Sequence, residues 1–564
     1  IQTITTLIIA AITLCGTPLK VQAATNKVYW TDSHSQVYYS INAKTSDVVK
    51  IALQLFAHDM QVVTGHAAKE KTNAPIQIFQ IDQLSNKEFA VLEKLGLPIH
   101  RFITKKDAFY IGTRNGKVIV VGSDARGTAY GILELSRMAG VSPWNDWSGC
   151  KPQRQSTLGT KTGYENLQFP DTEYRGLVLN SSRWMSNRNA SSIARLMLRL
   201  RANTLWQEGT HHEVIYDKAV TDSFDLIIGS GHKLQEVQGK KHKKHRHSIN
   251  DIKTLWSNPQ LWLRTSAPGL ILNEMDEKHE AYIANVYDPQ SAAYQLQLVM
   301  DLAWNHQSVT PTTLTHHLQT WLSNQLGSDL GKQLLPIMKE YYRLTSIRQP
   351  EYMIMPFGNM EFHSGEFGNE LERYLYAYDQ LKEKVKKIER SIPKESNDVF
   401  FQLVKYPIFS AALVAEKELE AQEARHIARP GLFDKDDEAK AAAALSLHAY
   451  QQLKVLVQHY CNIGKGKWRN IIAPNDGALQ MPQLPGRLNN EEVSLYKKDA
   501  FNRSSDLKPL RAMSNEIIAK NAYEWKNTSG ERPTTLIPLI GHSNQCVLLP
   551  KKSTLHYNFS ILKG

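Results

Sequence analysis

The chain has 564 residues, of which 42% are hydrophobic and 22% are charged, and its formal net charge is +12. A single hydrophobic core seldom extends beyond about 250–300 residues, so this length excludes a one-domain protein. The charge is compatible with a polyanionic partner, although much of the excess comes from one run, residues 240–247 (KKHKKHRH).

The N-terminal stretch has the pattern of a secretory signal peptide over residues 1–24. A short apolar run, residues 7–14 (LIIAAITL), precedes the small-residue exit VQAA at 21–24. The run is too short to cross a bilayer, and no other stretch approaches about 18 apolar residues, so we expect no membrane span. The remaining cysteines, Cys150, Cys461 and Cys546, are odd in number and far apart, which excludes a disulfide framework. The expected location is periplasmic or extracellular.

Residues 25–152 are predicted to form a small α/β domain. Ser46 is expected to cap a helix that Gly65 ends, and a buried strand at Lys117–Gly122 leads through a glycine-containing turn into a helix at 129–138. The turn does not have the glycine spacing of a phosphate loop, and that interpretation is rejected. The polar segment 153–170 is interpreted as a linker.

Residues 171–310 alternate between strand and helix patterns, which indicates a parallel sheet or barrel. A closed (β/α)8 barrel needs about 200–250 residues, and this segment is too short, so we expect an incomplete barrel with about five βα units. Strands are predicted at 174–179, 203–206, 225–228, 262–263 and 281–286, and helices at 191–201, 268–278 and 292–304.

Residues 311–465 carry repeated apolar stripes typical of a helical bundle. The segment 466–564 is rich in Pro, Asn and Gly and ends in β-like runs at 535–538 and 546–549, as at the start of a β-sandwich. The predicted fold class is therefore multi-domain α/β: an N-terminal α/β domain, an incomplete (β/α) barrel, a helical bundle and the start of a C-terminal β-sandwich.

Short motifs along the chain occur in the same order as in one enzyme family. They are GSDARGTAYG (122–131), GVSPW (140–144), YRG (174–176), LRLRANTLW (198–206), NVYD (285–288), DLAW (301–304), RQPE (348–351), FQLVKYP (401–407) and GKGKW (464–468). The sequence resembles glycoside hydrolase family 115, the xylan α-glucuronidases. The resemblance implies removal of glucuronic or 4-O-methylglucuronic acid from xylan side chains, by an inverting mechanism without a cofactor.

The sequence departs from the family where the catalytic acids are expected. After the first barrel strand the family has Asn-Asp-Glu, whereas Asn180 is followed here by Ser181 and Ser182. The stretch after the third strand keeps His232 but lacks the family's Glu. The Cys-Asp-Asp-Asn and Tyr-Tyr-His stretches of the next units have no counterpart before Trp256, so barrel strands four to six are expected to be absent.

Five residues at expected strand ends are the candidate site. Asp288 is the best surviving carboxylate and the candidate catalytic residue, the alternative being a helix N-cap. The candidate substrate-binding residues are Asn180, Trp206, His232 and Asn285. A core position is an equal alternative for Trp206. No metal is expected at the sequence HHE (211–213), because adjacent histidines cannot share one helix face.

The run at 240–247 has three interpretations: a polyanion site, a metal site, or a solvated loop that replaces the missing strands. The solvated loop is favoured, because a run of like charges cannot pack. Three functions remain open: a family 115-like glycosidase, a non-catalytic sugar-binding relative, and a polyanion binder. The expected partner is a glucuronoxylan-type glycan, not nucleic acid, and a homodimer is one way to cover the edges of an open sheet.

Overall fold

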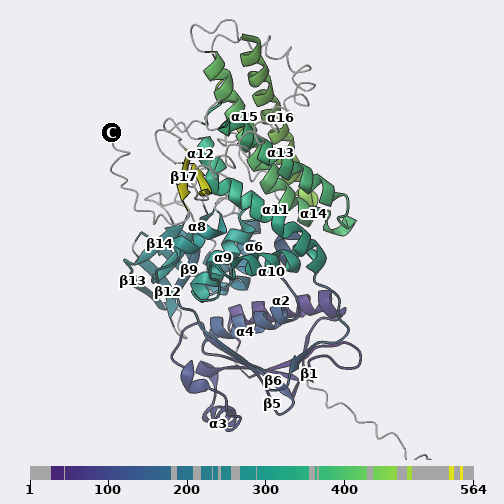
Figure 1. The fold of residues 1–564 in the computed structure, drawn as a ribbon. Coiled ribbons are helices and arrows are strands. Elements are labelled where there is room, and N and C mark those ends of the chain that lie inside the picture. Colours follow the sequence, from purple (N-terminus) through teal and green to yellow (C-terminus); the bar gives the residue numbers. More distant parts are fainter. Residues whose placement is uncertain are drawn as a thin grey trace, which may run out of the picture. The chain divides into compact units, whose positions relative to one another are not determined.

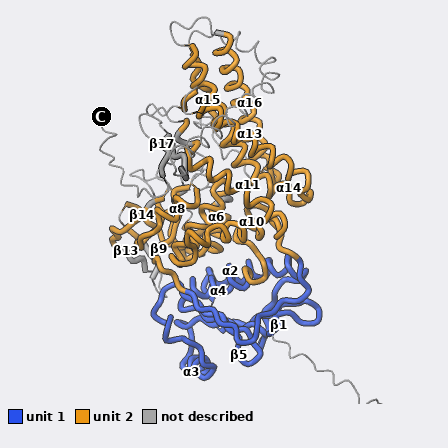
Figure 2. The backbone as a smooth tube through the Cα atoms, in the orientation of Figure 1, with its two compact units in different colours: residues 1–135, 154–168 blue, residues 136–153, 169–564 orange. Residues whose placement is uncertain are grey.

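The computed structural model divides into two compact units, residues 1–135 with 154–168 and residues 136–153 with 169–564 (Figure 2). Each unit is considered by itself. The structure describes residues 27–42, 45–179, 187–207, 218–231, 233–238, 243–255, 267–286, 289–354, 362–364, 368–428, 436–466, 479–485, 533–538 and 546–550.

Unit 1 is built on a mixed six-stranded sheet in the order β3-β2-β4-β6-β5-β8. The pairs β2–β3, β2–β4 and β4–β6 are parallel, whereas β5 pairs antiparallel with β6 and β8. Helices α2 and α4 lie along one face of this sheet and α3 lies on the other (Figure 1). The elements are β2 (Tyr38–Asn42), α2 (Asp47–Thr64), β3 (Lys69–Glu70), β4 (Ile76–Gln80), α3 (Asn86–Lys94), β5 (Phe109–Arg114), β6 (Lys117–Gly122), α4 (Ala125–Met138) and β8 (Glu165–Gln168).

Helix α2 confirms the helix predicted between Ser46 and Gly65. Its apolar residues recur every three or four positions and are buried, so one face of the helix packs on the sheet. Gly65 has φ = +92°, a left-handed conformation that glycine adopts without steric cost, and its N–H closes the last turn on Gln61. Ser46 occupies the N-cap position, but its hydroxyl makes no capping hydrogen bond.

The segment predicted as a linker, 153–170, contains two strands. β8 extends the main sheet through β5, and β7 (Gly159–Lys161) pairs antiparallel with β1 (Lys27–Tyr29). The indole N–H of Trp30 donates to Thr160 Oγ1 at 2.8 Å, which fixes this second pairing. The segment is polar because it forms an exposed edge of unit 1, and not because it is a linker.

The turn between β6 and α4 holds a buried group of charges. Asp124 accepts hydrogen bonds from the N–H of Gly127 at 2.7 Å and the N–H of Asp107 at 2.8 Å. Arg126 Nε lies 2.7 Å from Asp107 Oδ1 in a buried ion pair. Burial, followed by the neighbouring charge of Asp107, raises the pKa of Asp124 to about 6. This turn therefore ties strand to helix and leaves no open anion cradle.

The raised pKa makes the stability of unit 1 depend on pH. A carboxyl whose folded pKa exceeds its unfolded value stabilises the fold below the unfolded pKa, and that contribution is lost as pH rises through about 6. A shift of about two units corresponds to at most about 3 kcal/mol. Asp124→Asn removes the titration and one acceptor, and the lost hydrogen bond costs about 1 kcal/mol at every pH.

We therefore expect D124N to be less stable than the wild type at pH 4.5, and the deficit to shrink or reverse at pH 7.5. Equilibrium urea unfolding at each pH, read by pulsed hydrogen exchange of peptides covering 105–128, measures the difference. An equal deficit at both pH values would contradict the assignment of the titration to Asp124.

Unit 2 contains a curled seven-stranded sheet in the order β13-β12-β11-β10-β9-β15-β14. The five strands from β11 to β14 in this order are parallel to their neighbours. The other two, β12 and β13, form an antiparallel hairpin, and β12 pairs antiparallel with β11. The strands at the two ends of this order, β13 and β14, are not paired with each other. The bounds are β9 (Tyr174–Leu179), β10 (Thr204–Gln207), β11 (Ile227–Ser230), β12 (Lys233–Gln238), β13 (Lys243–Ser248), β14 (Ile252–Leu255) and β15 (Ala281–Val286).

This sheet agrees with the expected incomplete barrel. β9, β10 and β11 correspond to the first three predicted strands, and β15 to the last. The expectation of a loop at 240–247 is wrong for residues 243–247, because they lie in β13. The strand predicted at 262–263 lies outside the described residues, and the strand beside β15 is β14.

Helices cover one face of this sheet and form a bundle beyond it (Figure 1). The predicted bundle helices are present in the described part of residues 314–466. The helices of unit 2 are α5 (Asn145–Ser148), α6 (Asn187–Arg199), α7 (Lys218–Ser223), α8 (Pro268–Glu274), α9 (Ala293–Trp304), α10 (Leu314–Leu326), α11 (Ser328–Ile347), α12 (Pro350–Met353), α13 (Glu370–Glu389), α14 (Asn397–Phe400), α15 (Tyr406–Ile427) and α16 (Asp436–Gly466). Near the C-terminus, β16 (Pro533–Pro538) pairs with β17 (Cys546–Pro550).

One helical stretch, Lys394–Ile427, is long and apolar enough to cross a membrane by length and composition alone. However, 83% of its most apolar window is buried inside the protein. Packing against α13 and α16 accounts for that apolar character, as in the core helix of a bundle.

Candidate active site

The C-terminal ends of four neighbouring strands form one edge of the unit 2 sheet. In register, Asn285 of β15 is level with Val178 of β9, which is level with Trp206 of β10, and Trp206 is level with Gly229 of β11. Sites of (β/α) barrels are built at this edge, because every parallel strand delivers its following loop there. Two of the predicted site residues, Asn285 and Trp206, thus lie in one row, two strands apart.

Trp206 lies across Gly229. A Cβ atom on Gly229 would meet the Trp206 ring at 2.1 Å, so only glycine leaves room for the indole at this position. The ring belongs to a core cluster with Tyr174, Val178 and Ile227 and is 6% exposed. In this structure Trp206 packs in the interior of the sheet. A core position was the alternative to substrate binding that the sequence left open for this residue.

Asn285 is fully buried next to the end of β15. Asp288 follows three residues later in the sequence, but it lies outside the described residues, as do Asn180 and His232. The structure therefore places two of the five candidates.

The described strand ends carry no carboxylate. The last residues of the five parallel strands are Leu179, Gln207, Ser230, Leu255 and Val286. Inverting hydrolysis needs two carboxyl groups about 6.5–9.5 Å apart. Within the part of the chain that the structure describes, no such pair stands at this edge.

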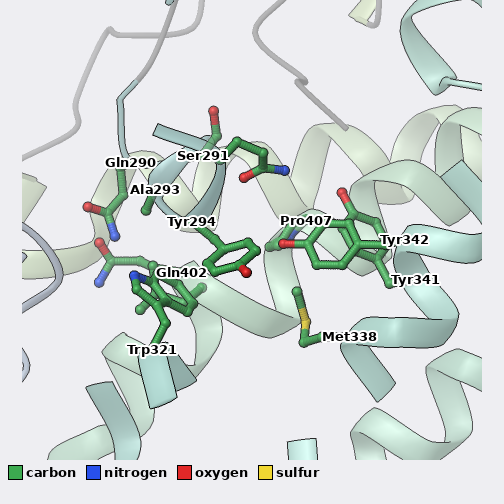
Figure 3. Close-up of a pocket in the computed structure, with 12 residues that line it drawn as sticks. Gln290, Ser291, Ala293, Tyr294, Trp321, Met338, Tyr341, Tyr342, Gln402 and Pro407 are labelled. Atoms are coloured by element: carbon green, nitrogen blue, oxygen red, sulfur yellow. The ribbon is translucent and has the colours of Figure 1, made fainter. Parts of the chain in front are cut away.

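A small cavity lies just beyond Asn285 in the chain, where the turn after β15 enters α9. Its volume of about 10 Å³ leaves room for about one water molecule and excludes a sugar. Tyr294 occupies the centre of the lining, with Trp321 and Gln290 on one side and Tyr342 on the other (Figure 3). The buried indole N–H of Trp321 has no acceptor among the described residues, so a water here would satisfy it.

The motif FQLVKYP (401–407) forms a π-helix, Phe401–Lys405, against this cavity. The wider turn brings Gln402 to the cavity, where its amide donates to the carbonyls of Asp398 at 2.8 Å and Ser148 at 3.3 Å. Single π-turns occur often beside functional sites. This motif thus contributes to the surroundings of the start of α9.

A polar network continues from the cavity along α9 and α10. The Tyr294 hydroxyl lies 3.1 Å from His317 Nδ1, and His317 Nε2 lies 3.3 Å from Asp301 Oδ2. Burial raises the pKa of Tyr294. Burial alone would also raise the pKa of Asp301, but the hydrogen bond to His317 and the charge of Arg201 outweigh it, so that this pKa is lowered. The network holds the start of α9, and sequence spacing gave no sign of it.

Three of the sequence motifs meet around Trp304. Arg175 and Arg201 both place their guanidinium groups over its ring, with Cζ 5.1 Å and 4.8 Å from the centroid. Arg175 is fully buried and donates to the carbonyls of Arg201 at 2.9 Å and Thr172 at 2.7 Å. These motif residues join the base of β9 to α9 and do not take part in the candidate site.

No group of three or more His, Cys, Asp or Glu side chains in the described ranges has the geometry to hold a metal ion. The sequence HHE (211–213) lies outside those ranges.

Comparison with known proteins identifies one family. Residues 253–352, from β14 through α12, match the model of glycosyl hydrolase family 115. None of the curated proteins matches.

Two solved structures illustrate the structural likeness. The family GH115 4-O-methyl-α-glucuronidase BtGH115A, described as specific for decorated arabinogalactans, superposes with a TM-score of 0.67 at 24% identity and covers 80% of each chain. A GH138 enzyme described as targeting pectin rhamnogalacturonan II superposes with a TM-score of 0.46 at 11% identity. The match covers 84% of this chain and 80% of that enzyme, and the likeness is too low to bear on function. The resemblance to glycoside hydrolase family 115 is therefore confirmed, by the family model over residues 253–352 and by the shared fold.

Proposed function

We propose that this protein is a glycoside hydrolase that removes glucuronic or 4-O-methylglucuronic acid side chains from a xylan-type glycan. The observation that supports it most is the row at the C-terminal edge of the sheet, where Asn285 and Trp206 are in register. Asn285 lies inside the segment that matches the family model, three residues before Asp288. The relative BtGH115A, named for 4-O-methyl-α-glucuronidase activity, makes decorated arabinogalactan a second glycan to test.

The proposed site spans β15, β9 and β10. Neighbouring strands are about 4.8 Å apart, so Asn285 and Trp206 have their backbones roughly 10 Å from one another. Val178, Asn285 and Trp206 are themselves buried, so in this proposal the row forms the floor of the site and the sugar ring lies beyond it, toward the loops that follow the strands. In this proposal Asp288 is one of the two carboxylates of the inverting pair. The second comes from a segment beyond the described strand ends.

The proposal is tested by release of uronic acid from 4-O-methylglucuronoxylan and from a decorated arabinogalactan. We expect release by the wild type and a loss of about 100-fold in kcat/KM for Asp288→Asn, because general acid–base groups contribute about 10²–10⁴-fold. Asp276→Asn is the matched control, since Asp276 is an exposed carboxylate after α8, and it should leave the rate unchanged. No release at high enzyme load would reject hydrolysis.

A second candidate is a sugar-binding protein without turnover. The hairpin β12–β13 favours it, because it follows β11 where the family has the strands and loops expected to carry its acid and base. In this case glucuronate oligosaccharides bind in calorimetry while the release assay stays negative. If neither binding nor release is found, both candidates fail.

A further inference from the structure

A group of titratable side chains lies at the N-terminal edge of the unit 2 sheet, opposite to the edge of the candidate site. Three strands begin level with one another there, because Ala281 of β15 pairs with both Tyr174 of β9 and Ile252 of β14. The group comes from the residues before these strands, from β15 and from the segment after α9. Its members are Asp171, Asp251, Lys278, His279, Tyr282 and His306. The group therefore joins three strands and one helix.

The first half of the group holds β14 against β15. His279 Nδ1 lies 2.5 Å from Asp251 Oδ1, and the other carboxylate oxygen of Asp251 accepts from the N–H of Glu280 at 3.1 Å. The N–H of Ala281 donates to the carbonyl of Asp251 at 3.2 Å. The hydrogen bond with His279 lowers the pKa of Asp251, so this carboxylate stays charged in mild acid.

Tyr282 lies between two imidazole rings. It is fully buried, and its ring meets those of His279 and His306 edge to face, with centroids 5.5 Å and 5.6 Å away. Its hydroxyl donates to the carbonyl of Glu277 in the loop before β15. Burial raises the pKa of Tyr282 to about 12, so this hydroxyl does not titrate near neutral pH. The tyrosine thus connects the loop before β15 to the segment after α9.

His306 forms the second half of the group, at the end of α9. Its backbone N–H donates to Asp171 Oδ2 at 3.0 Å, and its Nε2 lies 3.4 Å from Thr172 Oγ1. The other oxygen of Asp171 lies 3.3 Å from Lys278 Nζ. The second ring nitrogen of His306, Nδ1, is buried and has no hydrogen-bond partner among the described residues. Only one nitrogen of this ring therefore has a partner in the described structure.

This environment favours the neutral form of His306. A neutral imidazole has one N–H and one lone pair, and the hydroxyl of Thr172 can serve Nε2 in either tautomer. A protonated ring has two N–H donors, and the one at Nδ1 would be buried without an acceptor in the described structure. Burial accordingly lowers the pKa of His306. The charge of Asp171 opposes this effect, and the charges of Lys278 and His279 add to it.

We propose that His306 is an acid-sensitive switch, whose protonation releases the segment after α9 from Asp171, Thr172 and Tyr282. A base with a folded pKa below its unfolded value of about 6.5 stabilises the fold above that value, and the contribution is lost as pH falls through the folded pKa. The other half responds in the opposite sense, because protonation of His279 places a positive charge on the Asp251 carboxylate. Acid thus opens the end of α9 and leaves β14 paired with β15.

Hydrogen exchange of the full chain at pH 7.5 and pH 4.5 tests the switch, with each rate divided by the intrinsic rate at that pH. The N–H groups of Asp171 and Thr172 report on opening, because they donate to the carbonyls of Trp304 and Ala303 at the end of α9. His306→Phe keeps a ring beside Tyr282 but cannot take up a proton. The matched control is H316F, which removes an exposed histidine of α10. Circular dichroism checks that each variant is folded.

In the wild type and H316F, protection over 169–174 and 303–308 should fall about 10-fold or more at pH 4.5, while 281–286 keeps its protection. H306F should show the same protection at both pH values. If H306F does not fold, His306→Gln takes its place with the same expected result.

Three outcomes would overturn the switch. One is an acid-dependent loss in H306F as large as in the wild type, and another is no loss in the wild type. The third is an equal loss over 281–286 and 303–308, which would show that acid unfolds this edge as a whole. None of these measurements depends on hydrolysis, so the switch and the proposed activity are tested separately.

Discussion

Replacing Trp304 with alanine is expected to destabilise unit 2 by about 4 kcal/mol. Removal of a buried tryptophan costs about 3–5 kcal/mol through lost transfer energy and the cavity that remains. At this position the ring also faces Arg175 and Arg201, whose guanidinium groups lie 5.1 Å and 4.8 Å from its centroid. Arg175 is fully buried, so loss of the ring removes the aromatic face that its guanidinium group contacts and leaves the backbone carbonyls as its partners.

Urea unfolding monitored by circular dichroism measures this change. Trp304→Phe keeps an aromatic face and should cost less, about 1–2 kcal/mol by the reduced volume. Leu270→Ala is the control for an apolar residue that is 37% exposed, and we expect a change within about 0.5 kcal/mol. A loss below about 1 kcal/mol for W304A would mean that the contacts between these motifs do not support the fold.

Gly127→Ala is expected to destabilise unit 1 by about 3 kcal/mol, although alanine is the better helix former. A Cβ atom on Gly127 would lie 2.2 Å from the carbonyl oxygen of Ala108. The obstacle is backbone of the neighbouring segment, so it cannot rotate away, and overpacking of this kind costs about 1–3 kcal/mol or more. The strain also acts on the Asp107–Arg126 ion pair next to Ala108.

The matched control is Gly269→Ala in α8, where the added methyl group would meet no described atom within 4 Å outside its chain neighbours and its own helix backbone. Here the helix propensity of alanine should dominate and stabilise by up to about 1 kcal/mol. Thermal unfolding of both variants beside the wild type gives the comparison. If G127A were as stable as G269A, the close approach of α4 to the Ala108 segment would be disproved.

The central strands of unit 2 could be predicted from the sequence almost residue for residue. Tyr174–Leu179 and Ala281–Val286 are β9 and β15 with the bounds expected. Both strands are covered on two faces, and parallel strands of this kind are continuous apolar runs that local patterns reveal. The same reasoning located α9 within one residue at its start.

The hairpin could not be predicted in this way, because its composition contradicts a strand. β13 consists of Lys, His, Arg and Ser, and its extended form follows from register with β12, which Leu234 anchors in the core. β8 in unit 1 is a similar case, since β5 supplies the pairing that a polar tetrapeptide alone does not indicate. In both places tertiary pairing decides the structure.

The candidate site was predictable in part. The resemblance led to Asn285 and Trp206, and the structure adds that they share a row and that Trp206 is packed against Gly229. The link from Tyr294 through His317 to Asp301 could not be foreseen, because its members lie on two helices and follow no known spacing.

The antiparallel hairpin also bears on how a β/α sheet can stop short of closure. The outer N–H and C=O groups of β11 find their acceptors and donors in β12, a strand reached by a tight turn instead of a long crossover. The hairpin thus satisfies the outer groups of β11 within one polypeptide and makes β13 the terminal strand on that flank. A short antiparallel hairpin can in this way occupy the position beside β11 that further βα units take in a closed barrel.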